Sequence, residues 1–386
     1  MAEHAFIAAR VFDGTDWHDN AAVTVDGGKV GEVVPKSRLK SGIDTTDLGD
    51  VSMVPGFVDL QVNGGGGVLL NNEPSVSGIE TICAAHRGLG TTALFPTLIT
   101  DTPEHTARAI SAAIAAHQKG VQGFAGLHVE GPHLSLARKG AHDPNLIRPM
   151  NDDDLRRLIE ARPHLPALMT TVAAENVTPD QVSALAEADI LVSIGHSDAD
   201  YDSVVRLAEV GATMVTHLFN AMSQIGNRQP GLVGATLDLG TLNAGIIVDG
   251  FHVHPASVGI ALRAKRAPGR IFLVSDAMSP AGTDIQELEL NGRTILRRDG
   301  RLTLTDGTLA GADLDLAQAV RVLTSKVGVE LGEALRMAST FPAEIAGLDG
   351  YGALRPGFRA DMTILDAELQ VQGTVVGGRS QGLFPV

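Results

Sequence analysis

The sequence is poor in cysteine, with Cys83 as its sole example among 386 residues. One cysteine excludes an internal disulfide and any cysteine-rich metal site. Cys83 lies in the apolar run IETICAAH, residues 79–86. Such a run predicts a buried helix position for this side chain rather than a reactive thiol.

Basic residues are also in deficit, since 30 lysines and arginines face 45 aspartates and glutamates, for a formal net charge of −15. This balance argues against a nucleic-acid or anionic-membrane surface, so an anionic substrate would need a local cluster of donors. No stretch approaches eighteen apolar residues, and the N-terminus lacks a basic segment followed by an apolar one. We therefore expect a soluble cytoplasmic protein that binds neither nucleic acid nor membrane.

Both ends of the chain are rich in short apolar strands. HAFIAARVFDG and AVTVDGGKVGEVV stand near the N-terminus, and ADMTILDAELQVQGTVVGG stands near the C-terminus. Strands left unpaired at both ends would expose backbone groups and apolar faces. We therefore predict that residues 1–54 and 353–386 form one small β-sandwich domain, and that residues 55–352 form the catalytic domain.

The middle of the chain alternates short β-rich runs with alanine-rich helical segments. Eight strand–helix units predict an α/β fold of the closed parallel (β/α)8 type, a TIM-like barrel. Asn-Gly and Asp-Gly turns in residues 289–314 predict β-hairpins inserted before two closing helices, and NDDDLRR, residues 151–157, predicts a helix N-terminus. The eight runs are FVDLQV, TALFPTL, FAGLHVE, ALMTTVA, ILVSIGH, ATMVTH, NAGIIVD and IFLVSD.

Polar residues end several of these runs, where barrel enzymes carry their chemistry. Glu130, His196 and His217 offer one carboxylate and two imidazoles on three strand ends, which is a catalytic metal set with a position left for water. Singly, Glu130 is also compatible with a helix cap, and each histidine with a structural hydrogen-bonded role. Together in the predicted register they favour a metal site.

Asp276 ends the eighth run and is predicted to project into the same mouth. A carboxylate there can take a proton from metal-bound water and pass it to a leaving amine, although an N-cap is the alternative. The loops that follow the third, sixth and seventh runs offer further polar side chains for substrate capture. These are His142, Asn220, Arg228 and His252, while Asp249 is a further polar residue at the end of the seventh run.

The first strand end, DLQVNGGGG, carries Gln61 and Asn63 where many metal hydrolases carry His-x-His. Amide side chains are poor ligands for a transition metal. The spacing therefore leaves open whether this is a lost metal site or a site built differently.

Motifs spread over nearly the whole chain resemble those of the N-acetylglucosamine-6-phosphate deacetylase family, within the amidohydrolase superfamily. Their number and order make the resemblance specific. They are VPGFVDLQVNG, HVEGPHLSLARKGAHDP, SIGHSDA, THLFNAMS, DGFHVHP, LVSDAM, LAGADLDL and LRPGFRADMTILD.

The resemblance implies that metal-activated water hydrolyses the acetamide of N-acetyl-D-glucosamine 6-phosphate, releasing acetate and D-glucosamine 6-phosphate. It implies that Glu130, His196 and His217 hold the metal, that Asp276 is general base and then general acid, and that His142 polarises the carbonyl. It also implies a homodimer in which Arg228 reaches the phosphate in the neighbouring subunit. The implied sugar-pocket residues are Ala141, Asn220, Ala221, His252, Leu309, Ala310, Gly311 and Ala312.

Members of that family carry either His-x-His with two metals or Gln-x-Asn with one, and Gln61 and Asn63 match the second kind. We therefore expect one divalent ion per subunit, zinc first, with iron, cobalt or manganese as alternatives. His133 departs from the family pattern, and predicts either added weak metal affinity or an altered loop. Two further hypotheses remain: an amidohydrolase for a cyclic amide or an N-acyl amino acid, and a non-catalytic barrel that serves in an assembly.

Overall fold

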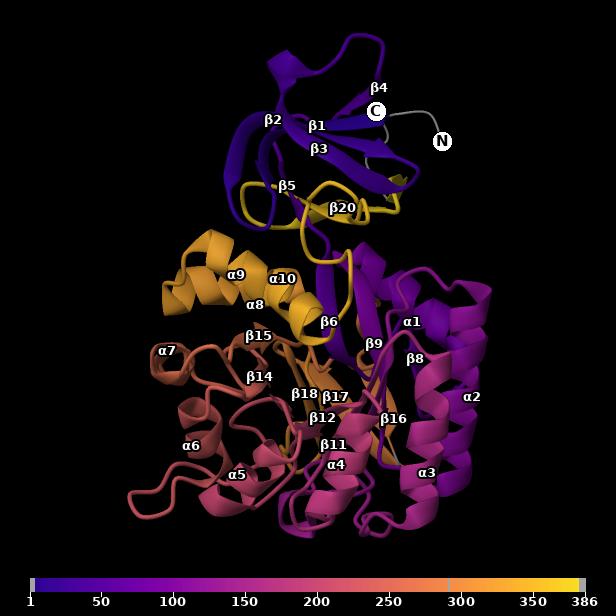
Figure 1. Ribbon diagram of the computed structural model, residues 1–386, viewed down its shortest axis with the longest axis vertical. Helices are drawn as coiled ribbons and strands as arrows, with labels where there is room; N and C mark the ends of the chain where they lie inside the picture. Colours follow the sequence, from indigo (N-terminus) through magenta and orange to yellow (C-terminus); the bar gives the residue numbers. More distant parts are fainter. Residues whose placement is uncertain (1–3, 291, 382–386) are drawn as a thin grey trace.

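The computed structural model describes residues 4–290 and 292–381 (Figure 1). Within these residues, eight parallel strands in chain order form the predicted (β/α)8 sheet, and each of the eight runs overlaps one of them. The strands are β6 (Phe57–Val62), β9 (Thr91–Ile99), β10 (Leu127–Glu130), β11 (Leu168–Val172), β12 (Leu191–Ile194), β13 (Met214–Val215), β14 (Asn243–Ile246) and β15 (Ile271–Leu273).

The barrel closes between β6 and the chain that follows β15. No regular ladder joins these two strands in the described residues, and single backbone bonds do so instead. Asp276 N–H donates to Gln61 O at 3.0 Å, and Asn63 N–H donates to Ala277 O at 2.9 Å. The closure therefore brings the first and the last strand ends together.

Helices cover the outside of the barrel (Figure 1), and all of those named below except α6 begin after a residue whose side chain accepts a hydrogen bond from the first turn. The predicted helix start at residue 151 is confirmed, because Asn151 caps α3 and forms a reciprocal capping box with Asp154. Cys83 is fully buried on α1, as expected. The helices are α1 (Val76–Gly88), α2 (Pro103–Lys119), α3 (Asp152–Ala161), α4 (Pro179–Glu187), α5 (Tyr201–Glu209), α6 (Gly231–Asp238) and α7 (Pro255–Ala264).

The chain closes on α8 (Leu316–Val322), α9 (Leu331–Ala338) and α10 (Thr340–Ile345). The expectation of two closing helices was therefore wrong for the described chain. Ser339 is the physical reason, because its φ of −136° and ψ of −70° interrupt one apolar helical pattern between α9 and α10. No helix in the described ranges is both long and apolar enough to cross a membrane.

The two chain ends meet in one sheet, which confirms the predicted small domain. N-terminal β5 pairs antiparallel with C-terminal β19, with Val54 opposite Thr363. Side chains from both ends, such as Phe6 and Ile364, share a separate buried core. Residues 1–3 and 382–386 of the predicted domain lie outside the described chain. The strands are β1 (His4–Phe12), β2 (Trp17–Asp26), β3 (Lys29–Pro35), β4 (Asp44–Asp47), β5 (Ser52–Pro55), β19 (Met362–Leu365), β20 (Val371–Val376) and β21 (Arg379–Gln381).

An antiparallel sheet is inserted after β15, as the turn signals predicted. It contains β16 (Glu287–Leu290), β17 (Arg293–Arg298) and β18 (Arg301–Leu304). Asp299 and Gly300 join the last two strands with φ of 51° and 70°, which is the geometry of a two-residue hairpin turn. Asn291, in the other predicted turn, lies outside the described residues. The inserted sheet packs its apolar face, including Ile295, onto the mouth of the barrel.

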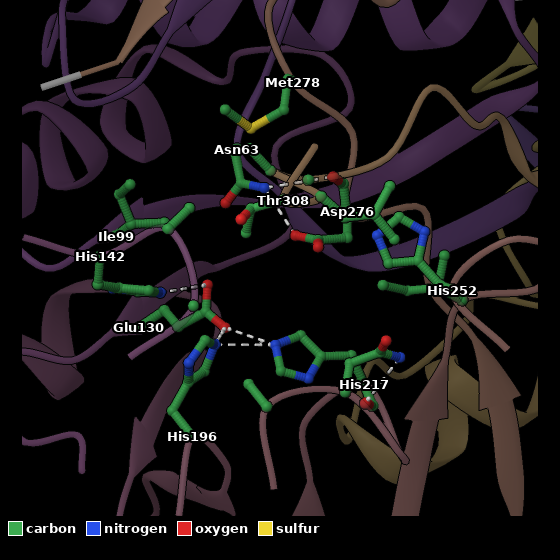
Figure 2. Close-up of a pocket in the computed structure, with 18 of the residues that line it drawn as sticks. Asn63, Ile99, Glu130, His142, His196, His217, His252, Asp276, Met278 and Thr308 are labelled. Atoms are coloured by element: carbon green, nitrogen blue, oxygen red, sulfur yellow. Dashed lines mark hydrogen bonds and ion pairs between the residues drawn. The ribbon is translucent and has the colours of Figure 1, made fainter. Parts of the chain in front are cut away.

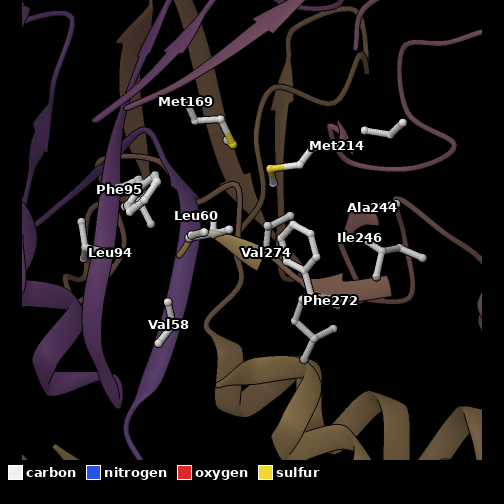
Figure 3. Close-up of a cluster of buried hydrophobic side chains, with 14 of the residues drawn as sticks. Val58, Leu60, Leu94, Phe95, Met169, Met214, Ala244, Ile246, Phe272 and Val274 are labelled. Carbon is white, nitrogen blue, oxygen red and sulfur yellow. The ribbon is translucent and has the colours of Figure 1, made fainter. Parts of the chain in front are cut away.

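Apolar side chains fill the interior of the barrel (Figure 3). Leu60, Phe95 and Phe272 are among the large side chains that are buried there, each at most 1% exposed. A polar band lies nearer the carboxyl ends of the strands, where His128 bonds to Thr171 at 2.7 Å. The apolar layer therefore forms a rigid floor beneath the polar mouth.

Candidate active site

A cavity of about 550 Å³ lies at the carboxyl ends of the barrel strands (Figure 2). It gathers most of the residues that the sequence singled out. Gln61, Arg228 and Ala312 do not line it: Gln61 is buried, Arg228 is exposed on the loop after β13, and Ala312 is buried with its N–H bonded to Asp276 O. The expected residues that do line it are Asn63, Glu130, Ala141, His142, His196, His217, Asn220, Ala221, His252, Asp276, Leu309, Ala310 and Gly311.

Glu130, His196 and His217 present three ligand atoms in a compact triangle. Glu130 Oε1 lies 3.4 Å from His196 Nε2 and 3.3 Å from His217 Nε2. The two Nε2 atoms lie 3.0 Å apart. A tetrahedral zinc ion with ordinary bond lengths holds its ligands about 3.4 Å apart. The side chains present therefore fit a metal ion at this point.

The hydrogen bond of His196 prepares that imidazole as a ligand. Its Nδ1 lies 2.8 Å from Arg138 O, which can only accept, so Nδ1 carries the proton. The lone pair on Nε2 then faces the triangle. A backbone carbonyl in this position is a common support for a metal-binding histidine.

Glu130, His142 and His196 form a second group whose ligand atoms all lie within 4.8 Å of one another. His142 differs from the other imidazoles, because Thr100 N–H donates to its Nδ1 at 3.3 Å. The ring proton is thereby placed on Nε2, which lies 4.0 Å from Glu130 Oε2. Burial lowers the pKa of His142 to about 3, so the ring is neutral. His142 therefore offers a hydrogen-bond donor to the cavity, not a metal-binding lone pair.

The two carboxylates of the site are held in different electrostatic environments. Burial opposes ionisation of Glu130, but the contacts of its carboxylate with the imidazoles of His196 and His217 outweigh burial and hold the pKa of that carboxyl well below its usual range. Burial raises the pKa of Asp276, and the negative charge of Glu130 raises it further. Glu130 thus stays ionised as a metal ligand, while Asp276 can exchange a proton. Acid–base hydrolysis needs this division of roles.

Gln61 and Asn63 direct their NH2 groups at these carboxylates. Gln61 Nε2 donates to Glu130 Oε1 at 3.1 Å and to Asp276 Oδ1 at 3.2 Å. Asn63 Nδ2 donates to Asp276 Oδ1 at 2.7 Å. Asn63 Oδ1 is buried and has no partner among the described residues. The two amides therefore act as donors to acidic groups.

Three key residues have left-handed backbone conformations. The φ angles are 47° for His196, 28° for His217 and 51° for Asp276. Side chains with a Cβ rarely adopt this region, and such strain concentrates at functional sites. Each strand end therefore turns sharply and directs its polar side chain into the mouth.

His252 is fixed by a buried carboxylate at another part of the cavity. Its Nδ1 lies 2.6 Å from Asp249 Oδ2. Burial opposes ionisation of Asp249, but the hydrogen bond and charge of His252 lower the pKa of that carboxyl. Asp249 Oδ1 also accepts from the N–H of Phe251 and of His252 itself. The pair leaves Nε2 of His252 available for an anionic or hydroxyl-bearing ligand.

His133 does not line the cavity. Its Nδ1 bonds to Arg148 O at 3.1 Å, and its Nε2 lies 3.8 Å from an Asp154 carboxylate oxygen. The expectation of weak metal affinity is therefore not supported by its position. His133 instead joins the two ends of the loop that carries His142 into the site.

Sequence reasoning missed the apolar lining of the cavity and the groups that orient the imidazoles. Arg138 acts through its backbone carbonyl, for which the residue type carries no signal, and Thr100 contacts His142 through both its N–H and its hydroxyl. Ile99 and Met278 stand next to residues of interest, but apolar side chains at strand ends are read as core. The missed lining residues are Ile99, Ala137, Arg138, Gly140, Ile247, Met278, Leu290, Gly307 and Thr308.

The fold and the site together define a barrel hydrolase with a metal-binding mouth. The model of the amidohydrolase family matches residues 52–380, and the model of the NagA composite domain matches residues 4–50. The family is metal-dependent, and the cluster of Glu130 with buried imidazoles can bind a metal ion.

Relatives narrow the class further. The chain is 39% identical to N-acetylgalactosamine-6-phosphate deacetylase of Shewanella sp. (strain ANA-3), over 89% of this chain and 84% of that one. It is 34% identical to N-acetylglucosamine-6-phosphate deacetylase of Haemophilus influenzae, over 98% and 99%. The protein belongs to this deacetylase group of the amidohydrolase family and is an enzyme that acts on amide bonds.

Solved structures agree with this assignment. N-acetylglucosamine-6-phosphate deacetylase from Pasteurella multocida superimposes with a TM-score of 0.94 at 34% identity, covering 98% of this chain and 99% of that one. The D267A mutant of the Mycobacterium smegmatis deacetylase, in complex with N-acetyl-D-glucosamine 6-phosphate, gives 0.91 at 29% identity, with full coverage of both chains.

Proposed function

We propose that this enzyme hydrolyses the acetamide of N-acetyl-D-glucosamine 6-phosphate to D-glucosamine 6-phosphate and acetate, in amino-sugar catabolism and cell-wall sugar recycling. The observation that carries the proposal is the triangle of Glu130, His196 and His217 facing Asp276 across one cavity. The relatives and the complex of the smegmatis enzyme support the choice of substrate.

Glu130, His196 and His217 hold one divalent ion per subunit in this proposal, most favourably zinc, with iron, cobalt or manganese as alternatives. Such an ion, when bound, polarises the scissile carbonyl and lowers the pKa of water. Gln61 and Asn63 occupy the position of a second ion, and their NH2 groups point at the carboxylates. A group that presents N–H donors repels a cation, which supports one ion rather than two.

Asp276 accepts one proton of the attacking water and then delivers it to the nitrogen of the leaving amine. The C–N bond breaks with that transfer, so the amine leaves neutral. The acid that forms keeps the water oxygen, and it becomes acetate when it releases the second proton of the water to solvent. His142 Nε2–H donates to the carbonyl oxygen, where negative charge accumulates during attack. The raised pKa of Asp276 suits a group that must both take and return a proton.

The sugar phosphate occupies the remainder of the cavity. We assign Ala141, Asn220, Ala221, His252 and Leu309–Gly311 to the sugar side, with His252 available to the phosphate. Ala312 does not contact the substrate in this proposal, and its N–H instead supports the backbone of Asp276 by donating to Asp276 O. Arg228 is exposed and outside its own cavity, which supports a homodimer in which it reaches the partner's site. The cytoplasmic location and the domain boundaries at residues 54/55 and 352/353 stay predictions.

The test is acetate release from N-acetyl-D-glucosamine 6-phosphate by the zinc-loaded enzyme. Asp276→Asn should lower kcat by about 10²- to 10⁴-fold while metal content is unchanged. Turnover at the wild-type rate in this variant would refute the assigned role. Equal kcat/KM with and without the substrate phosphate would instead favour an enzyme for cyclic amides or N-acyl amino acids.

The galacto epimer belongs in the same assay, because the Shewanella relative is named for it. A higher kcat/KM for N-acetyl-D-galactosamine 6-phosphate would shift the preferred substrate but leave the chemistry intact. A metal-free protein, inactive after addition of zinc, cobalt or iron, would support the non-catalytic assembly role.

A further inference from the structure

One side of the cavity is apolar and has no role in the mechanism above. Ile99, Met278 and Leu290 line the cavity and are each at most 6% exposed. They come from the end of β9, the segment after β15, and inserted strand β16. The three side chains belong to one buried cluster, which the inserted sheet forms with the barrel mouth. We call these three residues the apolar wall.

The apolar wall lies beside the reacting groups. Thr100, the residue after Ile99, bonds to the His142 ring, and Met278 stands two residues after Asp276. Figure 2 shows Ile99 next to His142 and Met278 next to Asn63, with His252 on the opposite side of Asp276. A substrate atom between His142 and Asp276 therefore has the apolar wall on one side and the sugar-binding groups on the other.

The geometry of an amide decides what faces the wall. Its acyl carbon carries an oxygen, a nitrogen and the acyl chain in one plane. The oxygen must face His142 and the triangle, and the nitrogen must face Asp276 with the sugar beyond it. The third substituent, the methyl group of an acetamide, then points away from His252 and toward the wall.

We infer that Ile99, Met278 and Leu290 form the acyl pocket of this enzyme, and that they limit its substrates to short N-acyl groups. The inference rests on the proposed deacetylase function and adds its acyl specificity. An apolar surface suits a methyl group, because it stabilises the bound acyl chain without competing for the carbonyl oxygen.

The apolar wall has little freedom to retreat from a longer chain. The backbone of Ile99 is held on both sides, since its N–H and C=O bond to the Asn71 side chain at 3.1 Å and 3.0 Å. Met278 packs against Gly311, where even a Cβ would overlap its side chain. Close-packed interiors of this kind resist added methylene groups. A propionyl group should therefore fit poorly.

The test compares N-acetyl, N-propionyl and N-butyryl forms of the same amino-sugar 6-phosphate, with kcat/KM measured for each. For the wild-type enzyme, the N-propionyl substrate should be at least about 10-fold poorer than the N-acetyl one, because one methylene group in a tight pocket is worth roughly 10- to 200-fold. Met278→Ala should reduce this discrimination by about 10-fold, mainly by restoring kcat/KM for the longer chains.

Ile99→Val makes a smaller change and serves if Met278→Ala does not fold, as checked by its thermal transition. It should shift the ratio of kcat/KM for the N-propionyl substrate to kcat/KM for the N-acetyl substrate in the same direction, by a few-fold. Ile247→Val is the matched control, because Ile247 lines the cavity as the residue after β14 but lies outside the apolar wall. Its propionyl-to-acetyl ratio should equal that of the wild type.

An unchanged ratio in both wall variants, or an equal shift in Ile247→Val, overturns the acyl pocket. These outcomes differ from failure of the proposed function, in which the wild-type enzyme with zinc would release no acetate from either hexosamine phosphate. Equal wild-type rates on acetyl and butyryl substrates would also overturn the inference, while they would leave the deacetylase chemistry standing.

Discussion

The side-chain amide of Asn63 donates to the carboxylate of Asp276 across 2.7 Å. These residues are 213 positions apart in the sequence and meet because the barrel closes between β6 and the chain after β15. The bond fixes the amide orientation, since an ionised carboxylate can only accept. The same closure that completes the fold thus aligns the proposed proton carrier.

Replacing Asn63 by alanine should move the acidic limb of the kcat/KM profile to higher pH. The bond from Asn63 lowers the pKa of Asp276 against burial, so its loss lets that pKa rise. Asp276 must be deprotonated to accept a proton, and more of it would then be protonated at a given low pH. A pH–rate profile checks this, with metal content measured as the control. A limb that stays in place or moves to lower pH would contradict the bond's assigned effect.

Metal content should distinguish the two ligand triads. His217→Ala should lose the ion on dialysis, because the tetrahedral set then lacks one donor. His142→Ala should keep about one ion per chain and lose kcat by about 10²- to 10³-fold, since it removes a donor to the carbonyl oxygen. Elemental analysis with protein quantification is the measurement. Loss of metal from His142→Ala, with retention in His217→Ala, would reverse the assignment.

Chelator treatment should leave an inactive chain that recovers with one equivalent of zinc. Two tightly bound ions per chain would contradict the donor orientation of Gln61 and Asn63. The comparison variant is Gln61→Glu, which replaces an N–H donor with a carboxylate. This variant should bind a second ion more readily than the wild type does. Titration of activity against added metal measures both.

Asp249→Asn should raise KM for the phosphorylated substrate by about 10-fold and leave kcat less affected. The change removes a buried carboxylate oxygen that lies 2.6 Å from His252 Nδ1, so the imidazole loses the partner that holds its ring in place. The readout is the ratio of kcat/KM for phosphorylated and unphosphorylated substrate. A purely structural role would lower both values equally and leave this ratio unchanged.

Leu60→Ala should reduce the free energy of unfolding by about 3–5 kcal/mol, since it leaves a cavity in the barrel interior. Leu60 is fully buried within the main core. Ile260→Ala is the control, because that side chain is 55% exposed on α7 and should change stability by less than about 0.5 kcal/mol. Denaturant titration monitored by circular dichroism tests both, and equal losses would show that the burial argument fails.

Much of the fold was predictable because its signals are local. Each barrel strand is a short apolar run, and Asp299-Gly300 predicts its hairpin turn from residue type alone. The site residues could be nominated because parallel strands bring their carboxyl ends to one face. Glu130 and His196 therefore meet in one cavity although 66 residues separate them.

The number of closing helices was harder to predict from the sequence, since the break at Ser339 lies within a continuous apolar pattern. His133 was harder for a related reason: its motif placed it beside the site, but its side chain turned to Arg148. Direction of a side chain depends on neighbours far away in the chain, and sequence periodicity does not report them.

The sequence by itself determined the strand order, the meeting of the two ends and the set of polar residues at the mouth, because periodicity and turn chemistry act over a few residues. Only the tertiary structure decided which imidazole nitrogens carry protons, where Gln61 and Asn63 point their amides, and which apolar side chains border the reacting atoms. Those choices depend on single hydrogen bonds and packing contacts across the closed barrel. Thr100 on His142 and Asn63 on Asp276 exist only once the strand ends are brought together.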